Sequence, residues 1–249
     1  PYGPVRWTSD DANLLVYDRF DIWQLDPQCQ RNPINVTGGE GRKTRNSYRY
    51  VQTDPEEYSL RPDQELILRR FDEVTKRSGW SGLRLDDPGA PVPKCFTDNV
   101  YGQLVKAKDT SVYAYTKETY VESPDLWVSK DLVSGRKLSN INPQQAGYNW
   151  GRAELFTWKA YDGKNATGIV YKPEDWDPKK KYPMIAYFYE KLSDGLNGYM
   201  APAPTPSRLN IPFFVSRGYI VLAPDIRYII GHPGPSAYNY VVSGARALV

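Results

Sequence analysis

The 249-residue sequence has few of the residues that build metal centres or disulfide frameworks. Its two cysteines are Cys29 and Cys95, and its one histidine is His232. The three lie far apart in the sequence and show no C-x-x-C spacing, which argues against a zinc site. We interpret the cysteines as two free, partly buried thiols, with a disulfide between them as the alternative. We expect no metal and no cofactor.

Long apolar runs and a large excess of one charge are also missing. No run approaches the ~20 apolar residues that a membrane-spanning helix needs, so we expect no membrane span. The formal net charge is only +3, which predicts no strong field for nucleic acid and therefore no nucleic-acid partner. The densest basic run, Lys179-Lys180-Lys181, lies between two prolines. We interpret it as a solvated turn and not as a phosphate site.

The two ends of the sequence are not typical of a complete chain. It begins Pro1-Tyr2-Gly3-Pro4, without an initiator methionine or a signal-like apolar segment, and it ends at Val249 inside a predicted helix. We therefore expect both ends to be cut from a longer protein. The compartment is not readable from such a piece, and we favour a periplasmic or secreted location over a cytoplasmic one.

Aromatic and turn-forming residues are abundant: 20 Tyr, 7 Trp, 21 Pro and 19 Gly. This composition favours many short strands joined by tight turns. A weak repeat runs through residues 1–150, in which Asp21-Ile22-Trp23, Ser78-Gly79-Trp80 and Asp125-Leu126-Trp127 occupy corresponding places. The tryptophans are 57 and 47 residues apart, close to the ~40–50 residues of a four-stranded propeller blade.

We predict that residues 1–150 form the blades of an incomplete β-propeller. Three blades do not close a propeller, which usually has about four to eight. Each repeat tryptophan is expected to pack between neighbouring blades while the aspartate anchors a turn, and a ligand-stacking role for the tryptophans is the alternative. The pair Glu56-Glu57 is interpreted as two solvated acids in a turn.

A different pattern begins near Gly151. We predict strands over 154–160, 166–172, 184–189 and 219–223, with a hairpin turn at Asp162-Gly163. The near-continuous apolar run 184–189 is typical of a strand buried on both faces. A short helix is expected over 210–217, ended by Gly218, and a second helix begins at a Ser236 cap. This order describes a right-handed parallel α/β sheet.

In this part the sequence resembles the prolyl oligopeptidase family of serine peptidases, and its dipeptidyl-peptidase and acylaminoacyl-peptidase branches in particular. The resemblance covers the whole chain and is strongest from about Trp158 onward. It rests on the segments 181–189 and 216–228, on Gly231, Gly234 and Ala237, and on the segment 241–244. It implies a mixed fold: the C-terminal blades of a β-propeller over 1–150, then the N-terminal part of an α/β-hydrolase domain over 151–249.

The resemblance implies one site residue within this chain. By position, Tyr189 is the tyrosine whose phenol donates a hydrogen bond to the tetrahedral oxyanion, a contribution of about 2.7–4 kcal/mol to the barrier elsewhere. The alternative is that Tyr189, with Tyr187 and Phe188, only fills the sheet. The sequence departs from the family in one respect, because Glu190-Lys191 stands where many relatives have a Gly-Pro turn.

The catalytic triad itself is not expected in this chain. No G-x-S-x-G motif is present, and in α/β hydrolases the triad follows in the order Ser, Asp, His, so all three would come after Val249. His232 is then a loop residue and not a catalytic base. Asp225 and Arg227 are expected to make a structural ion pair or turn at the edge of the sheet, with substrate contact by Arg227 as the alternative.

The resemblance therefore implies a peptidase that hydrolyses short peptides through an acyl-enzyme, in a protein longer than this chain. The chain alone is expected to be inactive, truncated before the nucleophile. Two other functions stay open: a non-catalytic interaction module with the same architecture, and a carboxylesterase that shares the hydrolase fold. Short peptides are the expected partners, and oligomerisation is possible but not predicted in any particular form.

Overall fold

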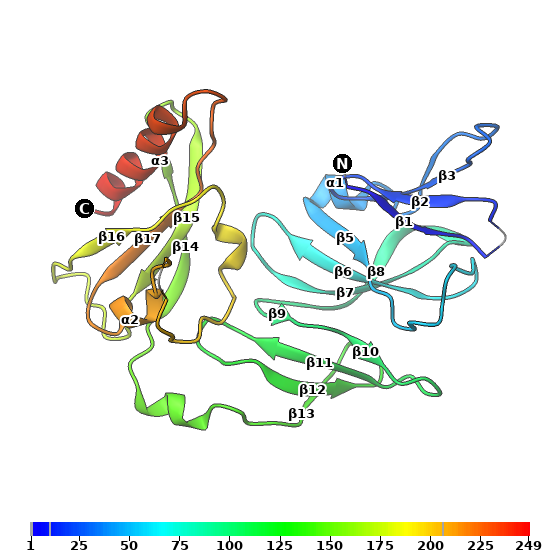
Figure 1. Cartoon of the computed structure of the whole chain (residues 1–249), viewed down its shortest axis with the longest axis horizontal. Coiled ribbons are helices and arrows are strands. Elements are labelled where there is room, and N and C mark those ends of the chain that lie inside the picture. The colour runs from blue at the N-terminus through cyan, green and yellow to red at the C-terminus, as the bar shows by residue number, and fades with distance from the viewer. Residues whose placement is uncertain (1, 10, 206) are drawn as a thin grey trace. The chain divides into compact units, whose positions relative to one another are not determined.

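The computed structural model describes residues 2–9, 11–205 and 207–249 of the chain. The chain divides into two compact units. The first consists of Pro1–Lys117 and Asp125–Ser139, and the second of Glu118–Pro124 and Asn140–Val249. The first unit is built almost entirely of strands, and the second combines a sheet with helices (Figure 1).

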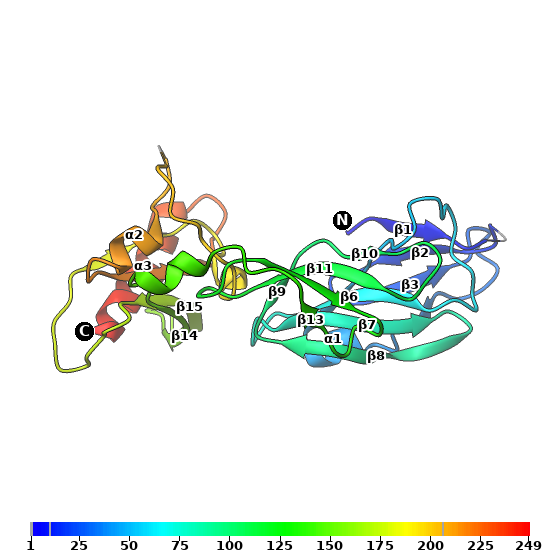
Figure 2. The same ribbon diagram turned by 90° about the horizontal axis from the view of Figure 1, so that it is seen from below.

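Three antiparallel sheets follow one another in the first unit (Figures 1 and 2). The first contains β1 (Pro4–Trp7), β2 (Leu14–Tyr17), β3 (Ile22–Leu25) and β4 (Ile34–Asn35), and the helix α1 (Glu40–Thr44) follows it. The second contains β5 (Asn46–Tyr50), β6 (Leu66–Asp72), β7 (Ser78–Arg84) and β8 (Asp87–Thr97). The third contains β10 (Val105–Lys106), β11 (Tyr113–Glu118), β12 (Asp125–Ser129) and β13 (Arg136–Lys137), and β9 (Val100–Tyr101) also pairs with β11. None of the sheets of the described residues is closed.

The repeat tryptophans lie on corresponding strands. Trp23, Trp80 and Trp127 are on β3, β7 and β12, and each of these is third in the order of its own sheet. The prediction that they occupy equivalent strands of successive sheets is confirmed.

A polar contact recurs with the tryptophans. Asp21 accepts a hydrogen bond from the Thr37 hydroxyl at 2.7 Å, and Asp125 accepts one from the Ser139 hydroxyl at 2.6 Å. In the second sheet Ser78 replaces the aspartate and donates to the Asn99 carbonyl at 2.6 Å. Each partner stands two residues beyond the last residue of its sheet's fourth strand. The predicted anchoring role of the repeat aspartates is thereby confirmed.

Two apolar clusters join these sheets in pairs. Leu15 and Ile22 of the first sheet pack with Leu66 and Leu68 of the second. Trp80, on the second sheet, is only 1% exposed and packs with aromatic and aliphatic side chains that come from or adjoin the third: Tyr101, Leu104, Tyr113, Tyr115 and Leu132. Trp80 therefore has the packing role that the repeat predicts, whereas Trp23 and Trp127 are only half-buried.

The second unit is organised around one mixed sheet. Its strands are β14 (Arg152–Lys159), β15 (Asn165–Lys172), β16 (Met184–Ala186) and β17 (Ile220–Pro224), in the spatial order β14-β15-β17-β16. Only β16 and β17 are parallel, and the other two pairs are antiparallel. The expectation of a parallel sheet is thus met at one pair alone, because the hairpin at Asp162-Gly163 reverses the chain between β14 and β15.

Two helices cover opposite faces of this sheet. The helix α2 (Ile211–Val215) packs with Ile169, Tyr171 and Val221, whereas α3 (Pro233–Leu248) packs with Trp158 and Ala166. Successive strand residues alternate between faces, so residues 166 and 169 of β15 belong to different faces. Two one-turn 3₁₀ helices, η1 (Pro143–Gly147) and η2 (Ser193–Gly195), complete the unit. Burial on both faces explains why β17 reads as a continuous apolar run.

Several local predictions for this unit are confirmed. The short helix expected over 210–217 is α2, which spans Ile211–Val215 and is followed by Gly218 with a φ of +83°. The Asn210 side chain caps it by accepting a hydrogen bond from Phe213 N at 3.0 Å. The Lys179-Lys180-Lys181 run is exposed. Ser236, in contrast, is not the cap of α3, because the helix begins at Pro233 and His232 precedes it. A proline at the first helical position favours this earlier start.

Candidate active site

Tyr189 lies just past the end of β16 and faces solvent. The strand stops at Ala186, three residues earlier than predicted, although Tyr187 N still donates to Leu222 O at 2.9 Å. The side chain of Tyr189 is 77% exposed and that of Phe188 is 44% exposed. Neither ring therefore fills the sheet, which was the alternative interpretation of this aromatic run. The expectation of a strand buried on both faces is wrong for 184–189, because the strand ends at Ala186 and none of the six residues is buried: Met184, Ile185 and Tyr187 are half-buried and the other three are exposed.

The backbone around Tyr189 is fastened to the segment that follows β17. The Tyr228 hydroxyl donates to the carbonyl oxygen of Tyr189 at 3.0 Å. Ile226 N donates to the carbonyl oxygen of the next residue, Glu190, at 2.7 Å. Because Ile226 is only 4% exposed, the second contact is shielded from competing water. The tyrosine ring is thus presented from a backbone held by the end of the neighbouring strand.

Asp225 holds the other end of the same loop. Its carboxylate accepts hydrogen bonds from Leu192 N at 2.8 Å and from Ser193 N at 2.9 Å, and also from the Ser193 hydroxyl. Of the two roles expected for Asp225, the turn is the one observed. No ion pair between Asp225 and Arg227 occurs in the parts of the chain that the structure describes, and Arg227 is exposed.

His232 and Ser236 lie at the start of α3, after the loop that contains Tyr228. The Ser236 hydroxyl donates to the carbonyl oxygen of His232 at 2.7 Å and accepts from Ile229 N at 3.0 Å. These contacts close the first turn of the helix. They give His232 a backbone role at the helix terminus, and its exposed side chain has no recorded hydrogen bond to another described residue.

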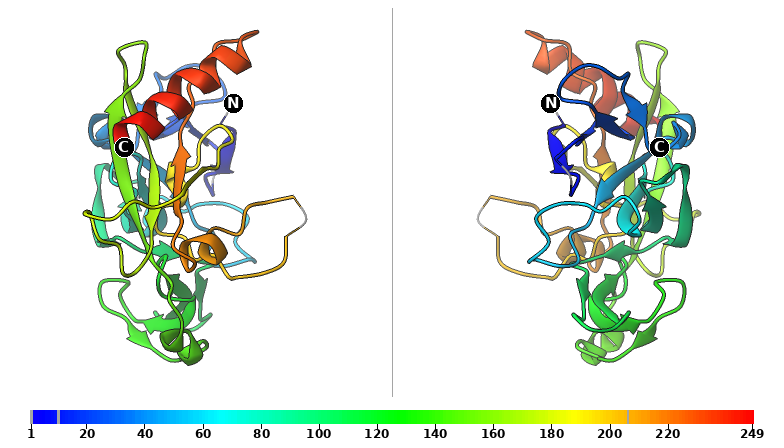
Figure 3. Two further views of the ribbon diagram at one scale, coloured as in Figure 1. Left: turned by 90° about the vertical axis from the view of Figure 1, so that its left-hand side faces the viewer. Right: turned by 90° about the vertical axis from the view of Figure 1, so that its right-hand side faces the viewer.

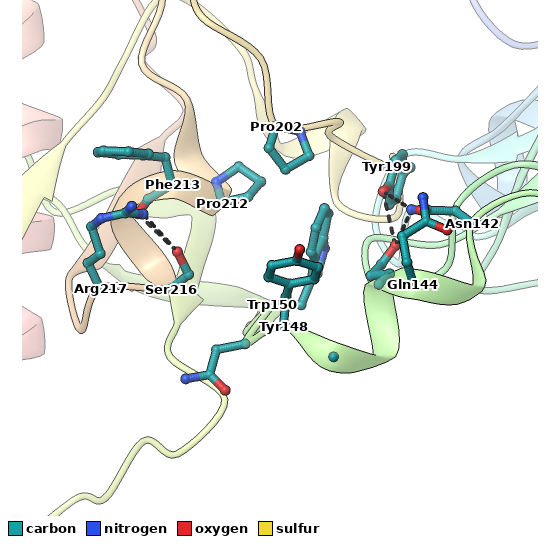
Figure 4. A pocket seen from close by; sticks show the side chains of 13 residues that line it. Asn142, Gln144, Tyr148, Trp150, Tyr199, Pro202, Pro212, Phe213, Ser216 and Arg217 are labelled. Carbon is teal, nitrogen blue, oxygen red and sulfur yellow. Dashed lines mark hydrogen bonds between the residues drawn. The ribbon is translucent and has the colours of Figure 1, made fainter.

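A separate cleft of about 810 Å³ lies within the second unit (Figure 4). Its centre is formed by Trp150 and Tyr199, whose rings stack with their planes 4° apart and their centroids 5.2 Å apart. Tyr148, Phe213 and Arg217 contribute further lining, and the Arg217 guanidinium lies 3.7 Å from the centroid of the Phe213 ring. The sequence analysis missed this cleft, and the only signal for it was the high aromatic content.

The polar side chains of the cleft are largely engaged with one another. The Tyr199 hydroxyl donates to Gln145 Oε1 at 2.9 Å, and Asn142 Nδ2 donates to the Tyr199 oxygen at 2.9 Å. Trp150 Nε1 donates to Tyr120 O at 2.7 Å. Burial raises the pKa of Tyr199, against a smaller lowering by the hydrogen bond from Asn142. This network ties the segments 118–124 and 140–150 into the second unit.

The cleft and Tyr189 belong to opposite ends of β17. Residues 213–217 of the cleft precede the strand, whereas Asp225 and Tyr228, which hold the Tyr189 loop, follow it. Ligands of open α/β sheets bind beyond the carboxyl ends of the parallel strands. Tyr189 follows the carboxyl end of β16, and β16 runs parallel to β17. Tyr189 therefore lies on the side of the sheet to which this rule refers, and the cleft lies on the other.

The remaining residues singled out from the sequence are the two glutamates 56 and 57 and the two cysteines. Glu56 is exposed and pairs with Lys108 at 3.3 Å, and Glu57 accepts a hydrogen bond from the Tyr50 hydroxyl at 3.2 Å. Both cysteines are free, with Cys29 exposed and Cys95 half-buried. Burial raises the pKa of the Cys95 thiol. In the part of the chain that the structure describes, no three His, Cys, Asp or Glu side chains are grouped as metal ligands.

None of the described helices has the length and apolar character of a membrane span.

No protein-family model matches the sequence, and no curated protein matches it either. Comparison with solved structures is more informative. A Bacteroides ovatus protein assigned as a dipeptidyl aminopeptidase IV matches 90% of this chain with a TM-score of 0.64 at 14% identity. The acylaminoacyl peptidase of Pyrococcus horikoshii matches 98% with a TM-score of 0.61 at 13% identity.

Prolyl oligopeptidase B of Galerina marginata matches 99% of the chain with a TM-score of 0.62 at 9% identity. The chain shares its fold with peptidases of the prolyl oligopeptidase family. At identities this low the likeness is one of fold alone. The chain spans only about a third of the length of these structures, with coverage of 33%, 37% and 34% respectively.

Proposed function

We propose that this chain is part of a serine peptidase of the prolyl oligopeptidase type that hydrolyses short peptides. Residues 1–150 would supply blades of its propeller and residues 151–249 the start of its α/β-hydrolase domain. The fold likeness to peptidases supports the proposal, as do the three sheets with tryptophan on the third strand. A periplasmic or secreted location is part of the same proposal.

One observation carries the proposal at the level of chemistry. Tyr189 is an exposed phenol, 77% accessible, on a backbone held at the carboxyl end of a parallel strand pair. A tyrosine that only packed the sheet would bury its ring. An exposed phenol in this place can donate a hydrogen bond to a developing oxyanion.

In the proposed mechanism, a serine supplied after residue 249 attacks the peptide carbonyl carbon while a histidine accepts its proton. The carbonyl oxygen becomes an oxyanion, and the Tyr189 hydroxyl and a backbone N–H hold it. Collapse expels the amine, which takes the proton from the histidine, and leaves an acyl-enzyme that water then hydrolyses. The propeller would restrict access to short peptides. No metal or cofactor takes part.

The decisive test is the substitution Tyr189→Phe in the intact protein. Removal of one oxyanion donor should lower kcat by about 100-fold to 1,000-fold and leave KM nearly unchanged, because the interaction forms only in the transition state. Steady-state kinetics with short peptide amides would measure both constants. Tyr238→Phe, an exposed tyrosine of α3, is the matched control and should behave as the wild type.

Two outcomes would replace this proposal with another. Turnover of simple aryl esters without turnover of peptide amides would favour a carboxylesterase. Absence of both activities in the intact protein would favour a non-catalytic interaction module.

A further inference from the structure

The loop that contains Tyr189 has no covalent means of keeping its shape. Residues 188–193 read Phe-Tyr-Glu-Lys-Leu-Ser, so no proline restricts a φ angle there. The ring of Tyr189 is 77% exposed, so packing does not restrain it either. Whatever fixes the phenol must therefore act on the backbone of this loop.

Four backbone groups in and next to the loop form hydrogen bonds with β17 and the segment after it. Tyr187 N donates to Leu222 O at 2.9 Å, and the carbonyl oxygen of Glu190 accepts from Ile226 N at 2.7 Å. The other two positions are Leu192 and Ser193, whose N–H groups meet the Asp225 carboxylate at 2.8 and 2.9 Å. These contacts lie on both sides of Tyr189 in the sequence.

Tyr228 contacts the backbone of Tyr189 itself through its side chain. Its hydroxyl donates to the Tyr189 carbonyl oxygen at 3.0 Å. The peptide unit that follows Tyr189 is thereby held at its oxygen by Tyr228, and the next peptide oxygen is held by Ile226. The first of these peptide planes contains the Cα of Tyr189, so its fixed oxygen restricts ψ of Tyr189, and the second restricts the residue that follows.

We propose that Asp225 and Tyr228 are positioning residues for Tyr189: they hold the loop so that the phenol is already aimed at the oxyanion before the substrate arrives. This inference rests on the proposed function of Tyr189. Neither residue touches the reacting atoms. Displacement of a catalytic group by about 1 Å can cost about 100-fold in rate, so a hydrogen bond remote from the chemistry can matter to kcat.

The test is a double-mutant cycle in the intact enzyme with Tyr189→Phe and Tyr228→Phe. Tyr228→Phe removes only the hydroxyl and should lower kcat about tenfold with KM unchanged. The double variant should be no slower than Tyr189→Phe alone, because a positioning group has nothing left to position. Independent, multiplying effects, or wild-type kcat in Tyr228→Phe, would overturn the proposal. Tyr238→Phe serves again as the control.

A second measurement needs no activity and uses the 249-residue chain. Hydrogen exchange of the Leu192 and Ser193 amides should accelerate at least about tenfold in Asp225→Ala, because both lose their acceptor. Asp225→Asn keeps one acceptor oxygen and should restore much of the protection. Unchanged exchange in Asp225→Ala would refute the positioning role of Asp225 while leaving the proposed function intact. A failure of the proposed function itself would instead appear as wild-type kcat in Tyr189→Phe.

Discussion

Single carboxylates organise the turns of the first unit. Asp21 is fully buried and accepts hydrogen bonds from Gly41 N at 2.9 Å and Arg42 N at 3.0 Å, besides its bond from Thr37. Nearby, Asp18 accepts from Phe20 N at 2.7 Å and from Trp23 Nε1 at 3.2 Å. A carboxylate that gathers several N–H donors fixes the backbone around it, and loss of its charge should loosen that turn.

Asp18 provides a pH-dependent prediction at this scale. Burial is the largest single influence and acts to raise its pKa, but hydrogen bonds from Asp21 N and Phe20 N, then from Arg42 and Trp23, lower the pKa to about 2. A lowered folded-state pKa means that the charged form stabilises the fold above the unfolded value of 3.8. That contribution is lost as the pH falls through about 2.

We therefore expect Asp18→Asn to reduce the free energy of unfolding by about 1 kcal/mol at neutral pH, after allowance for solvent screening. The difference between wild type and variant should shrink between about pH 4 and pH 2. Urea unfolding at several pH values measures it. Asp63→Asn, whose side chain is 73% exposed, is the control, and a cost independent of pH would contradict the assignment.

The three repeat tryptophans lie on corresponding strands of their sheets, but they do not contribute equally to the free energy of unfolding. Trp80 is 1% exposed and contacts the rings of Tyr101 and Tyr115 with centroid distances of 5.8 and 6.5 Å. Trp127 is half-buried, and Lys117 Nζ lies 4.5 Å from the centroid of its ring. A tryptophan packed between two sheets contributes more than a half-buried one, because more of its surface is removed from water.

The substitution Trp80→Ala should therefore lower the free energy of unfolding by about 3–5 kcal/mol, through lost burial and the cavity left behind. Trp23→Ala and Trp127→Ala should each cost only about 1–2 kcal/mol. Chemical denaturation followed by circular dichroism compares the three. Equal costs at all three positions would show that the repeat is energetically uniform, against the burial seen here.

At the scale of the whole molecule, the chain combines three open antiparallel sheets with one mixed sheet next to its one candidate site residue, and its sequence has no G-x-S-x-G motif. The chain passes from one compact unit to the other three times. The segment 118–124 belongs to the second unit, 125–139 belongs to the first, and the rest of the chain belongs to the second again. Trp150 and Tyr199 hold the segments that make these exchanges within the second unit. Under the proposed function, the reacting serine must come from sequence that this chain does not contain.

The 249-residue chain alone should accordingly show no labelling by a fluorophosphonate probe. The intact protein should be labelled at a single serine located after residue 249. Gel fluorescence and peptide mapping by mass spectrometry distinguish the two results. Stoichiometric labelling of the isolated chain would mean that one of its own serines is an activated nucleophile, and the proposed truncation would then be wrong.

Local features were readable from the sequence because neighbouring residues produce them. The Asp162-Gly163 hairpin, the short helix that ends before Gly218 and the corresponding positions of the three tryptophans all follow from short-range chemistry and spacing. The fold itself was predicted through resemblance, and the sheet-rich architecture agrees with the peptidase structures that the chain matches. The role of Tyr189 stays a prediction, although the exposure of its ring is now known.

Other features were decided only by the tertiary structure. Periodicity reports how side chains alternate, not how many neighbours a strand has, so the edge position of β16 and the early end of the strand at Ala186 were not predictable. The Asp225 carboxylate bonds residues 32 and 33 positions away, and the cleft around Trp150 gathers residues from 142 to 217. Such contacts form only after the sheet has brought distant segments together, and for this reason no local sequence pattern predicts them.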